Sequence, residues 1–396
     1  MKVVVLLDFT FYRTSDGKVW TPNIFGYSFW QRYLRVFDGV KVVAVVHDSE
    51  SIPENWGRAD GERVVFYAVP YNTKFISCLL NSGKLKKTFR EIVDNNDAVI
   101  CRVPSFHTHF LVSMLKRFGK PYGLEVTTDP RGFYVPGVIK HPLSHFLRWY
   151  YTGRLRDQCS SAYAVSYATE KVLQQSYPSG GLSTFYSNVE LDDADVKPIA
   201  RSKDNFRKDS FGIIFVGNLH NYVKAPDIML KAASMCIKKG KKIRLSMIGD
   251  GRLRPEIEKM ARFLSLTKHV KILGNISSKK AVFELLDVSD LFVMPSRTET
   301  IPRAMVEAMA RGLPCIGSNV GGIPELLTSE YLYPPDDAVA LADKIMEVID
   351  SPERMSHMSA LNIETATKYT NEKLDKKRTE FYIWIKTATE NIIINN

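Results

Sequence analysis

Short apolar runs alternate with helix-like stretches along the chain, and this alternation restricts the possible folds more than any other feature. In the first half, the runs occupy residues 3–9, 40–47, 63–69, 97–103, 121–127 and 161–166. They are apolar at consecutive positions, so a strand built from them buries both of its faces. Such strands, separated by helical segments, form parallel sheets that helices cover on both sides. The first half therefore predicts a doubly wound α/β domain.

The alternation stops between residues 188 and 211 and then begins again. The interruption, NVELDDADVKPIARSKDNFRKDS, is charged and nearly free of large apolar side chains, which is typical of a linker between domains. Further apolar runs follow at residues 211–217, 242–249, 270–274, 291–296 and 314–318. We expect two Rossmann-like domains, 1–190 and 210–369, that face a cleft, and a C-terminal helix within 370–396 that folds back on the first domain. Ligands of such sheets bind at the carboxyl ends of the strands.

The charge balance of the chain favours an anionic partner. Lys and Arg number 54 against 43 Asp and Glu, a formal net charge of +11, which suits a phosphate ligand, a nucleic acid or an acidic lipid surface. The five cysteines are scattered, without the spacing of a disulfide framework or a metal site, which favours a reducing cytoplasm. No stretch of the sequence approaches the ~20 consecutive apolar residues of a membrane-spanning helix.

The stretch SRTETIPRAMVEAMARGLP, residues 296–314, predicts a helix from about 302 to 311 with an anion site at its start. Pro302 suits the first turn because its missing N–H would be unpaired there, and Gly312 marks the other end. Free N–H groups and the helix dipole favour an anion at such an N-terminus. The residues placed there are Thr300, Ile301, Pro302 and Arg303.

Two glutamates flank the start of this helix. Glu299 precedes it, and Glu307 lies eight residues further on, about 80° around a helix of ~3.6 residues per turn, so both can face one cleft. A carboxylate beside an anion site can accept hydrogen bonds from neighbouring hydroxyls, such as those of a sugar ring and a ribose. The spacing alone is equally compatible with an amphipathic helix that carries one solvated glutamate. Glycine-bearing turns after four strands, with Lys224 near a helix start, favour the nucleotide site.

The second half resembles family 4 of the retaining glycosyltransferases with the GT-B fold. The E-x7-E pair of that family corresponds to Glu299 and Glu307, the segment MVEAMARGLP matches its context, and VGNL…VKA is similar to its G-R-L…K-G stretch. The resemblance covers most of residues 211–369, and the first half matches loosely. It implies a metal-independent hexosyltransferase that needs no cofactor and uses a nucleotide sugar of the UDP or GDP type.

The resemblance also implies roles for individual residues. Glu299 would hold hydroxyls of the donor sugar, Glu307 the nucleotide ribose and Lys224 the donor diphosphate. Gly26 resembles the glycine loop that closes over the diphosphate from the N-terminal domain. The remaining donor-binding positions are Gly217, Asn218, Gly249, Gly274, Asn275, Ile276, Thr300, Ile301, Pro302 and Arg303. The implied reaction is a retaining front-face transfer, in which the departing diphosphate helps to deprotonate the acceptor hydroxyl.

Two departures from the family pattern bear on activity. Family members usually carry an arginine at the position of Asn218, and many carry a histidine at that of Arg102. Losing a cation beside a developing diphosphate weakens leaving-group stabilisation, although Arg102, Arg303 or Arg13 can compensate. The alternatives are an altered donor, a catalytically impaired nucleotide-sugar-binding subunit, and a GT-B-type isomerase or phosphorylase.

The catalytic candidates on the acceptor side are Arg102 and Asp129. Arg102 ends a strand, where we expect an unpaired arginine at the mouth of the cleft that seeks an anion. Asp129 is either a carboxylate that orients the acceptor or part of an Asp-Pro turn.

Two other pairs resemble metal ligands without predicting a metal site. His107 and His109 follow a strand and begin a helix, and the sequence offers no third ligand for them. Asp193 and Asp195 mimic the D-x-D of metal-dependent glycosyltransferases, but they lie in the charged linker. We expect these two aspartates to be solvated.

Basic and aromatic residues interleave in segments 73–92 and 139–156 of the first half. They suit contact with an anionic membrane that carries a lipid-linked saccharide acceptor, as in the synthesis of a cell-surface polysaccharide such as O-antigen or capsule. The protein would then lie in the cytoplasm, on the inner face of the plasma membrane. The alternative is a core-facing helix with a lysine-rich outer face. A nucleic-acid partner is not expected, since the sequence contains no recognition module.

Overall fold

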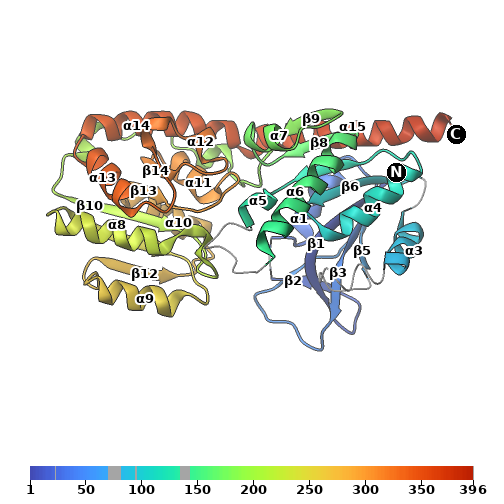
Figure 1. The fold of residues 1–396 in the computed structure, drawn as a ribbon, viewed down its shortest axis with the longest axis horizontal. Coiled ribbons are helices and arrows are strands. Elements are labelled where there is room, and N and C mark those ends of the chain that lie inside the picture. Colours follow the sequence, from blue (N-terminus) through green and yellow to red (C-terminus); the bar gives the residue numbers. More distant parts are fainter. Residues whose placement is uncertain (23, 70–81, 94–95, 134–142, 396) are drawn as a thin grey trace. The chain divides into compact units, whose positions relative to one another are not determined.

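A computed structural model describes residues 1–22, 24–69, 82–93, 96–133 and 143–395. The chain divides into two compact units, coloured mainly blue to green and green to red in Figure 1. The first comprises residues 1–130, 149–186 and 375–396, and the second comprises residues 131–148 and 187–374. The domain limits expected from the sequence differ from these units chiefly in residues 131–148, which group with the second unit.

A mostly parallel sheet forms the centre of the first unit. Its parallel strands lie in the order β5-β3-β1-β6-β7-β8-β9, so the chain winds outwards from β1 in both directions. These strands are β1 (Lys2–Arg13), β3 (Gly39–Asp48), β5 (Val64–Ala68), β6 (Ala98–Val103), β7 (Gly123–Val126), β8 (Ala164–Tyr167) and β9 (Leu182–Phe185). The short strand β2 (Val19–Thr21) pairs antiparallel with the end of β1, and β4 (Gly57–Arg58) pairs antiparallel with β2. The predicted doubly wound topology is confirmed for this unit.

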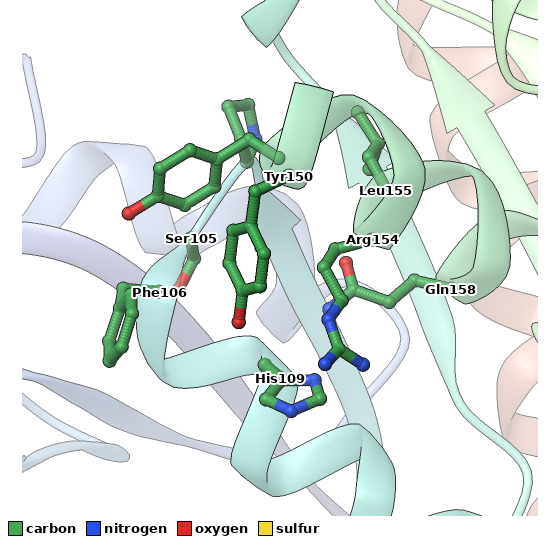
Figure 2. A pocket seen from close by; sticks show the side chains of 9 residues that line it. Ser105, Phe106, His109, Tyr150, Arg154, Leu155 and Gln158 are labelled. Carbon is green, nitrogen blue, oxygen red and sulfur yellow. The ribbon is translucent and has the colours of Figure 1, made fainter. Parts of the chain in front are cut away.

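Helices accompany these strands. They are α1 (Tyr27–Leu34), α3 (Ser82–Ile92), α4 (Phe106–Arg117), α5 (Pro130–Phe133), α6 (Ser144–Ser161), α7 (Val172–Ser176) and α15 (Asn371–Asn395). α4 and α6 lie side by side, with Tyr150 and Arg154 of α6 beside His109 of α4 (Figure 2). The α15 residues from 375 onwards belong to this unit, and the missing side chain of Gly123 leaves room for Phe381 of α15 against β7.

The second unit contains a six-stranded parallel sheet in the order β12-β11-β10-β13-β14-β15. The strands are β10 (Ser210–Val216), β11 (Lys242–Ile248), β12 (Val270–Gly274), β13 (Leu291–Met294), β14 (Cys315–Ser318) and β15 (Leu332–Tyr333). The chain moves in one direction from β10 to β12 and in the other from β13 to β15. The direction therefore reverses between β10 and β13, and Rossmann-like sheets bind ligands at such a reversal.

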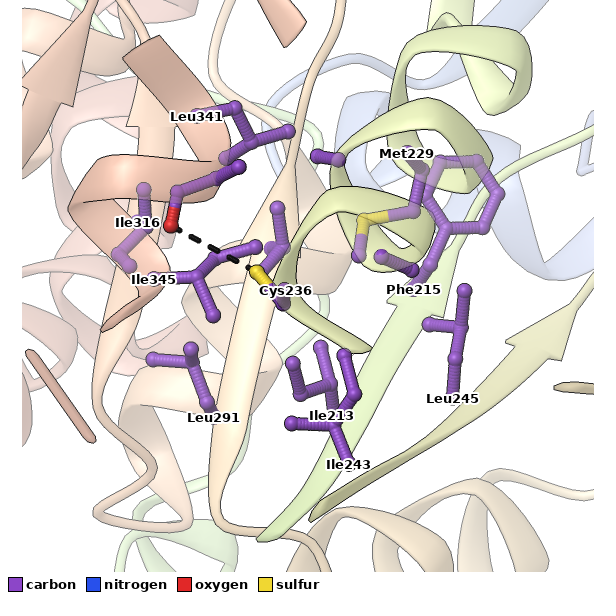
Figure 3. Packing of buried hydrophobic residues seen from close by; sticks show 14 of the residues in the cluster. Ile213, Phe215, Met229, Cys236, Ile243, Leu245, Leu291, Ile316, Leu341 and Ile345 are labelled. Atoms are coloured by element: carbon purple, nitrogen blue, oxygen red, sulfur yellow. Dashed lines mark hydrogen bonds between the residues drawn. The ribbon is translucent and has the colours of Figure 1, made fainter. Parts of the chain in front are cut away.

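Helices pack on this sheet and bury an apolar core. They are α8 (Pro226–Lys238), α9 (Arg254–Phe263), α10 (Lys279–Val288), α11 (Arg303–Ala310), α12 (Ile323–Leu326), α13 (Ala338–Ile349) and α14 (Pro352–Ala366). Figure 3 shows Ile213 and Leu245 of the sheet packed with Met229 of α8 and Ile345 of α13. The Cys236 thiol donates to the Ala342 carbonyl at 3.6 Å inside this core. Burial raises the pKa of Cys236 to about 11, so the thiol stays protonated and unreactive.

The charged segment 188–211, which the sequence predicts to be a linker between the domains, groups with the second unit. It packs on the second unit and contains two 3₁₀ turns, Asp193–Asp195 and Lys203–Phe206. Arg201 donates from Nη2 to the Leu286 carbonyl at 2.9 Å. Asp195 accepts from Lys279 Nζ at 2.6 Å, so it is paired, whereas Asp193 is exposed as expected. Hydrogen bonds to backbone carbonyls, ion pairs and a few buried apolar side chains, Val189, Leu191 and Phe206, hold this segment.

Among the residues that the structure describes, no helix is long and apolar enough to cross a membrane. No group of three or more His, Cys, Asp or Glu side chains within them could hold a metal ion.

Candidate functional site

A cavity of about 1040 Å³ opens in the second unit at the carboxyl ends of β10, β11 and β12 and beside the start of α11. The predicted donor-binding residues that line it are Gly217, Asn218, Lys224, Gly249, Asn275, Ile276, Arg303 and Glu307. Residues that line it without having been predicted include Glu190, His220, Asp250, Gly251, Arg252, Ser277 and Lys279. A volume of this size suits a small-molecule ligand. Glu299, Gly274, Thr300, Ile301 and Pro302 are not among the lining residues.

Lys224 and Glu299 meet where the sheet reverses direction. Lys224 ends the 3₁₀ helix η3 (Tyr222–Lys224) after β10, and Glu299 lies in the loop after β13. Lys224 Nζ donates to Glu299 Oε1, and the Ser296 hydroxyl donates to the same oxygen at 2.7 Å. The Glu299 side chain is 9% exposed. This sheltered cation and carboxylate are placed where the topology predicts a ligand.

Glycines allow the loops around this pair to approach one another. A Cβ on Gly217 would lie 2.9 Å from Lys224 Cγ, so the lysine side chain occupies the space that a larger residue would fill. A Cβ on Gly249, whose φ is +141°, would lie 1.9 Å from the Gly217 carbonyl oxygen. These two glycine turns therefore pack backbone against backbone and leave the cavity open beside them.

Helix α11 begins one residue later and ends one residue earlier than predicted. It spans Arg303–Ala310, and Pro302 is its N-cap in an extended conformation. Thr300 and Ile301 lie just before this start, and Gly322 N donates to the Thr300 carbonyl at 3.1 Å. The loop after β14 thus supports the turn that leads into α11. The predicted placement of residues 300–303 at a helix N-terminus is confirmed.

Glu307 lies on the face of α11 that lines the cavity, one turn after Arg303. Burial raises the pKa of Glu307, and the neighbouring Arg303 and Lys279 partly offset that rise. A carboxylate kept from water beside a cavity is poised to accept hydrogen bonds from a ligand that carries hydroxyl groups.

The structure contradicts the expectation that Arg102 is unpaired at the mouth of a cleft. Arg102 is 8% exposed and pairs with Glu125, the residue opposite it in the β6–β7 register. The Glu125 carboxylate also accepts from the hydroxyls of Tyr33, Tyr186 and Tyr382 at 2.9, 2.7 and 3.1 Å. Arg102 belongs to a buried polar network inside the first unit, so the prediction of an unpaired Arg102 was wrong.

The other predicted residues of the first unit lie at the ends of elements. Asp129 precedes α5 and accepts from the Tyr177 hydroxyl at 2.5 Å. Gly26 is the N-cap of α1, and its carbonyl accepts from Phe29 N at 2.9 Å. These positions are compatible with an acceptor-orienting carboxylate and a glycine loop, and both roles stay predictions.

The histidines of the first unit do not form a metal pair. His107 is fully buried, and its Nδ1 lies 2.5 Å from Asp8 Oδ1. His109 borders a cavity of about 20 Å³ between α4 and α6, and burial followed by the charge of Arg154 lowers the pKa of His109 (Figure 2). A buried water needs about 10–15 Å³ by this measure, so the cavity is too small for a sugar.

The two segments proposed to contact a membrane are partly described. Residues 73–81 and 139–142 lie outside the described residues. In α3, Leu85 and Phe89 are buried, whereas Lys86 and Lys87 are exposed. The described part of α3 is thus a core-facing helix with a basic outer face, the alternative considered from the sequence. In α6, Trp149 is 71% exposed.

Comparisons with known proteins identify a domain and a fold. Residues 196–364 match the family model described as glycosyl transferases group 1. Protein CapJ of Staphylococcus aureus is 26% identical over 89% of this chain and 88% of its own length. The sucrose-phosphate synthase of Thermosynechococcus elongatus superposes with a TM-score of 0.70 at 14% identity, over 98% of this chain and 100% of that one. Anabaena HepE, solved in complex with UDP-glucose, superposes with a TM-score of 0.62 at 16% identity, covering 96% and 98%.

These matches agree with the geometry of the site. The glycosyl transferases group 1 match includes Lys224, Glu299 and Glu307, and the solved neighbours have the GT-B fold. Residues 196–364 of the second unit are thus similar to the glycosyl transferases group 1 model, and the chain has the GT-B fold with two Rossmann-like units.

Proposed function

We propose that this protein is a retaining glycosyltransferase that moves a hexosyl unit from a nucleoside-diphosphate sugar to an acceptor hydroxyl. The observation that carries the proposal is the Lys224–Glu299 pair at the reversal of the second sheet, beside a cavity that Glu307 also lines. Such a donor contains a diphosphate, a sugar and a ribose. The Lys224 ammonium suits the diphosphate, and the carboxylates of Glu299 and Glu307 suit the hydroxyls of the sugar and the ribose. HepE, with the same fold, was solved with UDP-glucose, which supports a nucleotide sugar as the donor.

Each of these residues has a distinct part of the donor to hold. Lys224 neutralises the diphosphate, whose negative charge grows as its bond to the sugar breaks. Glu299 accepts hydrogen bonds from sugar hydroxyls, and Glu307 accepts them from the ribose. The start of α11 adds free N–H groups and the positive end of a helix dipole for the phosphate.

The transfer itself is a front-face displacement within this arrangement. The departing diphosphate oxygen takes the proton of the acceptor hydroxyl as the new bond to the sugar forms on the same face. The protein contributes position and charge, which Lys224 and Arg303 supply on the donor side. This mechanism requires no metal ion and no cofactor.

Asn218 supports a second candidate, a nucleotide-sugar-binding subunit with impaired catalysis. Its neutral amide lines the cavity at the position where related enzymes usually carry an arginine. Arg252, Lys279 and Arg303 line the same cavity and supply positive charge. We therefore favour the active enzyme, in which these residues replace the missing cation.

We propose that the acceptor is a lipid-linked saccharide used in the synthesis of a cell-surface polysaccharide. The basic outer face of α3 and the exposed Trp149 of α6 suit an anionic membrane surface. The protein would act at the inner face of the plasma membrane, where such an acceptor presents its saccharide.

Thermal unfolding and a transfer assay test the proposal in sequence. The protein would be heated with UDP, GDP and their hexose conjugates, because a ligand at about 100 times its Kd adds roughly 2.7 kcal/mol of stability. The stabilising conjugate would then be incubated with the protein, and release of the nucleoside diphosphate would be measured. Binding without release indicates the impaired subunit, whereas absence of both contradicts the proposal.

A further inference from the structure

Arg297 connects the loop that carries Glu299 to the segment that carries Lys224. It lies after β13, and its backbone N donates to the Val223 carbonyl at 2.8 Å. Its Nη1 donates to the Tyr222 carbonyl at 2.7 Å. Both the main chain and the side chain of Arg297 therefore hold residues that directly precede Lys224.

The same guanidinium forms two ion pairs. Nη1 and Nη2 donate to the two Asp227 carboxylate oxygens at 3.0 and 2.9 Å, in the bidentate geometry that suits arginine. Nε lies 2.7 Å from Asp336 Oδ1, in the loop after β15. The side chains of Arg297 and Asp227 are 10% and 12% exposed. We call the set of Arg297, Asp227 and Asp336 the Arg297 clamp.

The segment that the clamp holds has little regular structure of its own. η3 is a single 3₁₀ turn of three residues, and Ala225, which follows Lys224, has a left-handed φ of +48°. A non-glycine residue adopts that conformation at a cost and keeps it where the surroundings enforce it. The Lys224–Glu299 pair must also rearrange when phosphate takes the lysine. The Arg297 clamp does not depend on the Lys224–Glu299 ion pair, so it still restrains the segment when Lys224 leaves Glu299 for phosphate.

We infer that Arg297 is a positioning residue of the donor site, an inference that rests on the proposed function. It does not line the donor cavity, and it acts by fixing Lys224 and Glu299 relative to each other. A displacement of about 1 Å can lower a rate about 100-fold. The loss falls mainly on kcat, since the charge that Lys224 meets is largest in the transition state.

Arg311 provides a matched control for replacing Arg297. Its Nε and Nη2 donate to the two Asp287 oxygens at 2.8 and 2.5 Å, and its Nη1 donates to the Asp195 carbonyl at 2.9 Å. The Arg311 side chain is 12% exposed and follows the last turn of α11, the end remote from Glu299. Arg311→Met thus removes an ion pair of similar geometry and burial that contacts neither the Lys224 segment nor the Glu299 loop.

The experiment compares Arg297→Met with Arg311→Met in the full chain by steady-state transfer and by backbone hydrogen exchange. With the UDP- or GDP-hexose that the parent uses, we expect Arg297→Met to lower kcat about 10- to 100-fold and to change KM less. We expect faster exchange at residues 220–226 and 295–301. Arg311→Met should keep kcat within about threefold and loosen residues 308–312 instead. Arg297→Lys should restore kcat in part, because one ammonium cannot replace the guanidinium fork.

Equal kcat and equal exchange at 220–226 and 295–301 in the two methionine variants, with an active parent, would overturn the inference. If the parent neither binds nor uses any nucleotide sugar, the proposed function fails, and the hydrogen-exchange comparison still decides whether Arg297 holds the two segments.

Should Arg297→Met not fold, Asp336→Ala removes one contact of Arg297 with a half-exposed partner. It should lower kcat and loosen the same segments to a smaller degree, and a parent-like Asp336→Ala would then count against the clamp.

Discussion

Lys224 and Glu299 form an ion pair across the two loops that follow β10 and β13, the neighbouring strands between which the second sheet reverses direction. A third group, the Ser296 hydroxyl, donates to the same Glu299 oxygen. The pair keeps a cation and a carboxylate sheltered and satisfied before a ligand arrives. A nucleotide sugar offers a partner for each, phosphate for the lysine and hydroxyls for the glutamate.

The first prediction concerns Lys224→Ala. It should weaken binding of the nucleoside diphosphate and the nucleotide sugar, and it should lower kcat further, because the diphosphate charge grows as the sugar leaves. Loss of a charged hydrogen bond costs about 1.5–3 kcal/mol, or roughly ten- to hundredfold in affinity. Calorimetric titration and steady-state kinetics measure the two effects. An unchanged kcat would show that Lys224 does not stabilise the departing diphosphate.

The second prediction separates the two glutamates. Glu307→Ala should weaken the nucleoside diphosphate and the nucleotide sugar alike, since both contain ribose. Glu299→Ala should spare the free nucleoside diphosphate and impair sugar binding or transfer, by about ten- to hundredfold. Titration of each variant with both ligands is the measurement. If both variants bind and turn over like the parent, the pair does not hold a donor.

The third prediction uses the raised pKa of Glu307. The folded pKa lies above the unfolded one, so the folded state binds more protons between the two values and loses stability as pH rises through that window. At neutral pH the ionised Glu307 therefore destabilises the fold. Glu307→Gln should raise the free energy of unfolding at pH 7, and the gain should shrink as pH falls to the unfolded pKa. Denaturant unfolding at several pH values measures this.

The same Glu307→Gln variant should bind the nucleotide more weakly, because the amide is a poorer acceptor for ribose hydroxyls than the carboxylate. A gain in stability combined with a loss of affinity is typical of a residue kept for function. A difference in unfolding free energy between parent and variant that does not change with pH would contradict the raised pKa of Glu307.

The sequence predicts the features that local pattern controls. Buried parallel strands read as apolar runs, so β10 to β14 lie within a few residues of their expected positions. Pro302 and Gly312 bound α11 because they restrict the backbone locally. The turns at Gly217 and Gly249 also belong to this class, and their close approach explains why glycine occurs there.

Features that depend on a partner remote in sequence were not predictable. The sequence alone suggests that Arg102 is an unpaired cation, because Glu125 is 23 residues away. The β6–β7 register places Glu125 opposite it. Segment 188–211 has only a weak apolar signal, because Arg201 holds part of it through backbone carbonyls and few of its side chains, among them Leu191 and Phe206, are apolar and buried. Arg297 has no motif of its own, since two of its partners are the main-chain oxygens of Tyr222 and Val223.

The fourth prediction tests the membrane surface. Liposomes that contain anionic lipid should bind the protein, and binding should fall as salt is added. Lys86→Glu with Lys87→Glu should abolish much of this binding without unfolding, because both side chains are exposed on α3. Lys268→Glu with Lys271→Glu, on exposed positions of the second unit, is the control of equal charge. Equal loss in both double variants would indicate a general charge effect.

The fifth prediction concerns Arg102, which the sequence suggested as catalytic and the structure places in a buried pair. Burial alone would raise the pKa of Glu125, but the Arg102 guanidinium and the hydrogen bonds from Tyr186 and Tyr33 together hold that pKa below its usual value. Arg102→Met leaves this carboxylate buried without its cation, so it should cost about 3–5 kcal/mol of unfolding free energy. Adding Glu125→Gln should restore part of the loss by removing the uncompensated charge, which chemical denaturation would measure.

Lys41→Met is the control that distinguishes a structural role of Arg102 from a catalytic one. Lys41 Nζ donates to the buried Asp97 at 2.6 Å in the same unit, and that pair lies at the other end of the strands from the Arg102–Glu125 pair. At a temperature where both variants stay folded, a structural Arg102 predicts that Arg102→Met and Lys41→Met keep similar kcat values. A destabilising substitution by itself does not lower the kcat of the molecules that remain folded. A kcat more than about tenfold lower in Arg102→Met alone would therefore indicate that Arg102 takes part in the reaction.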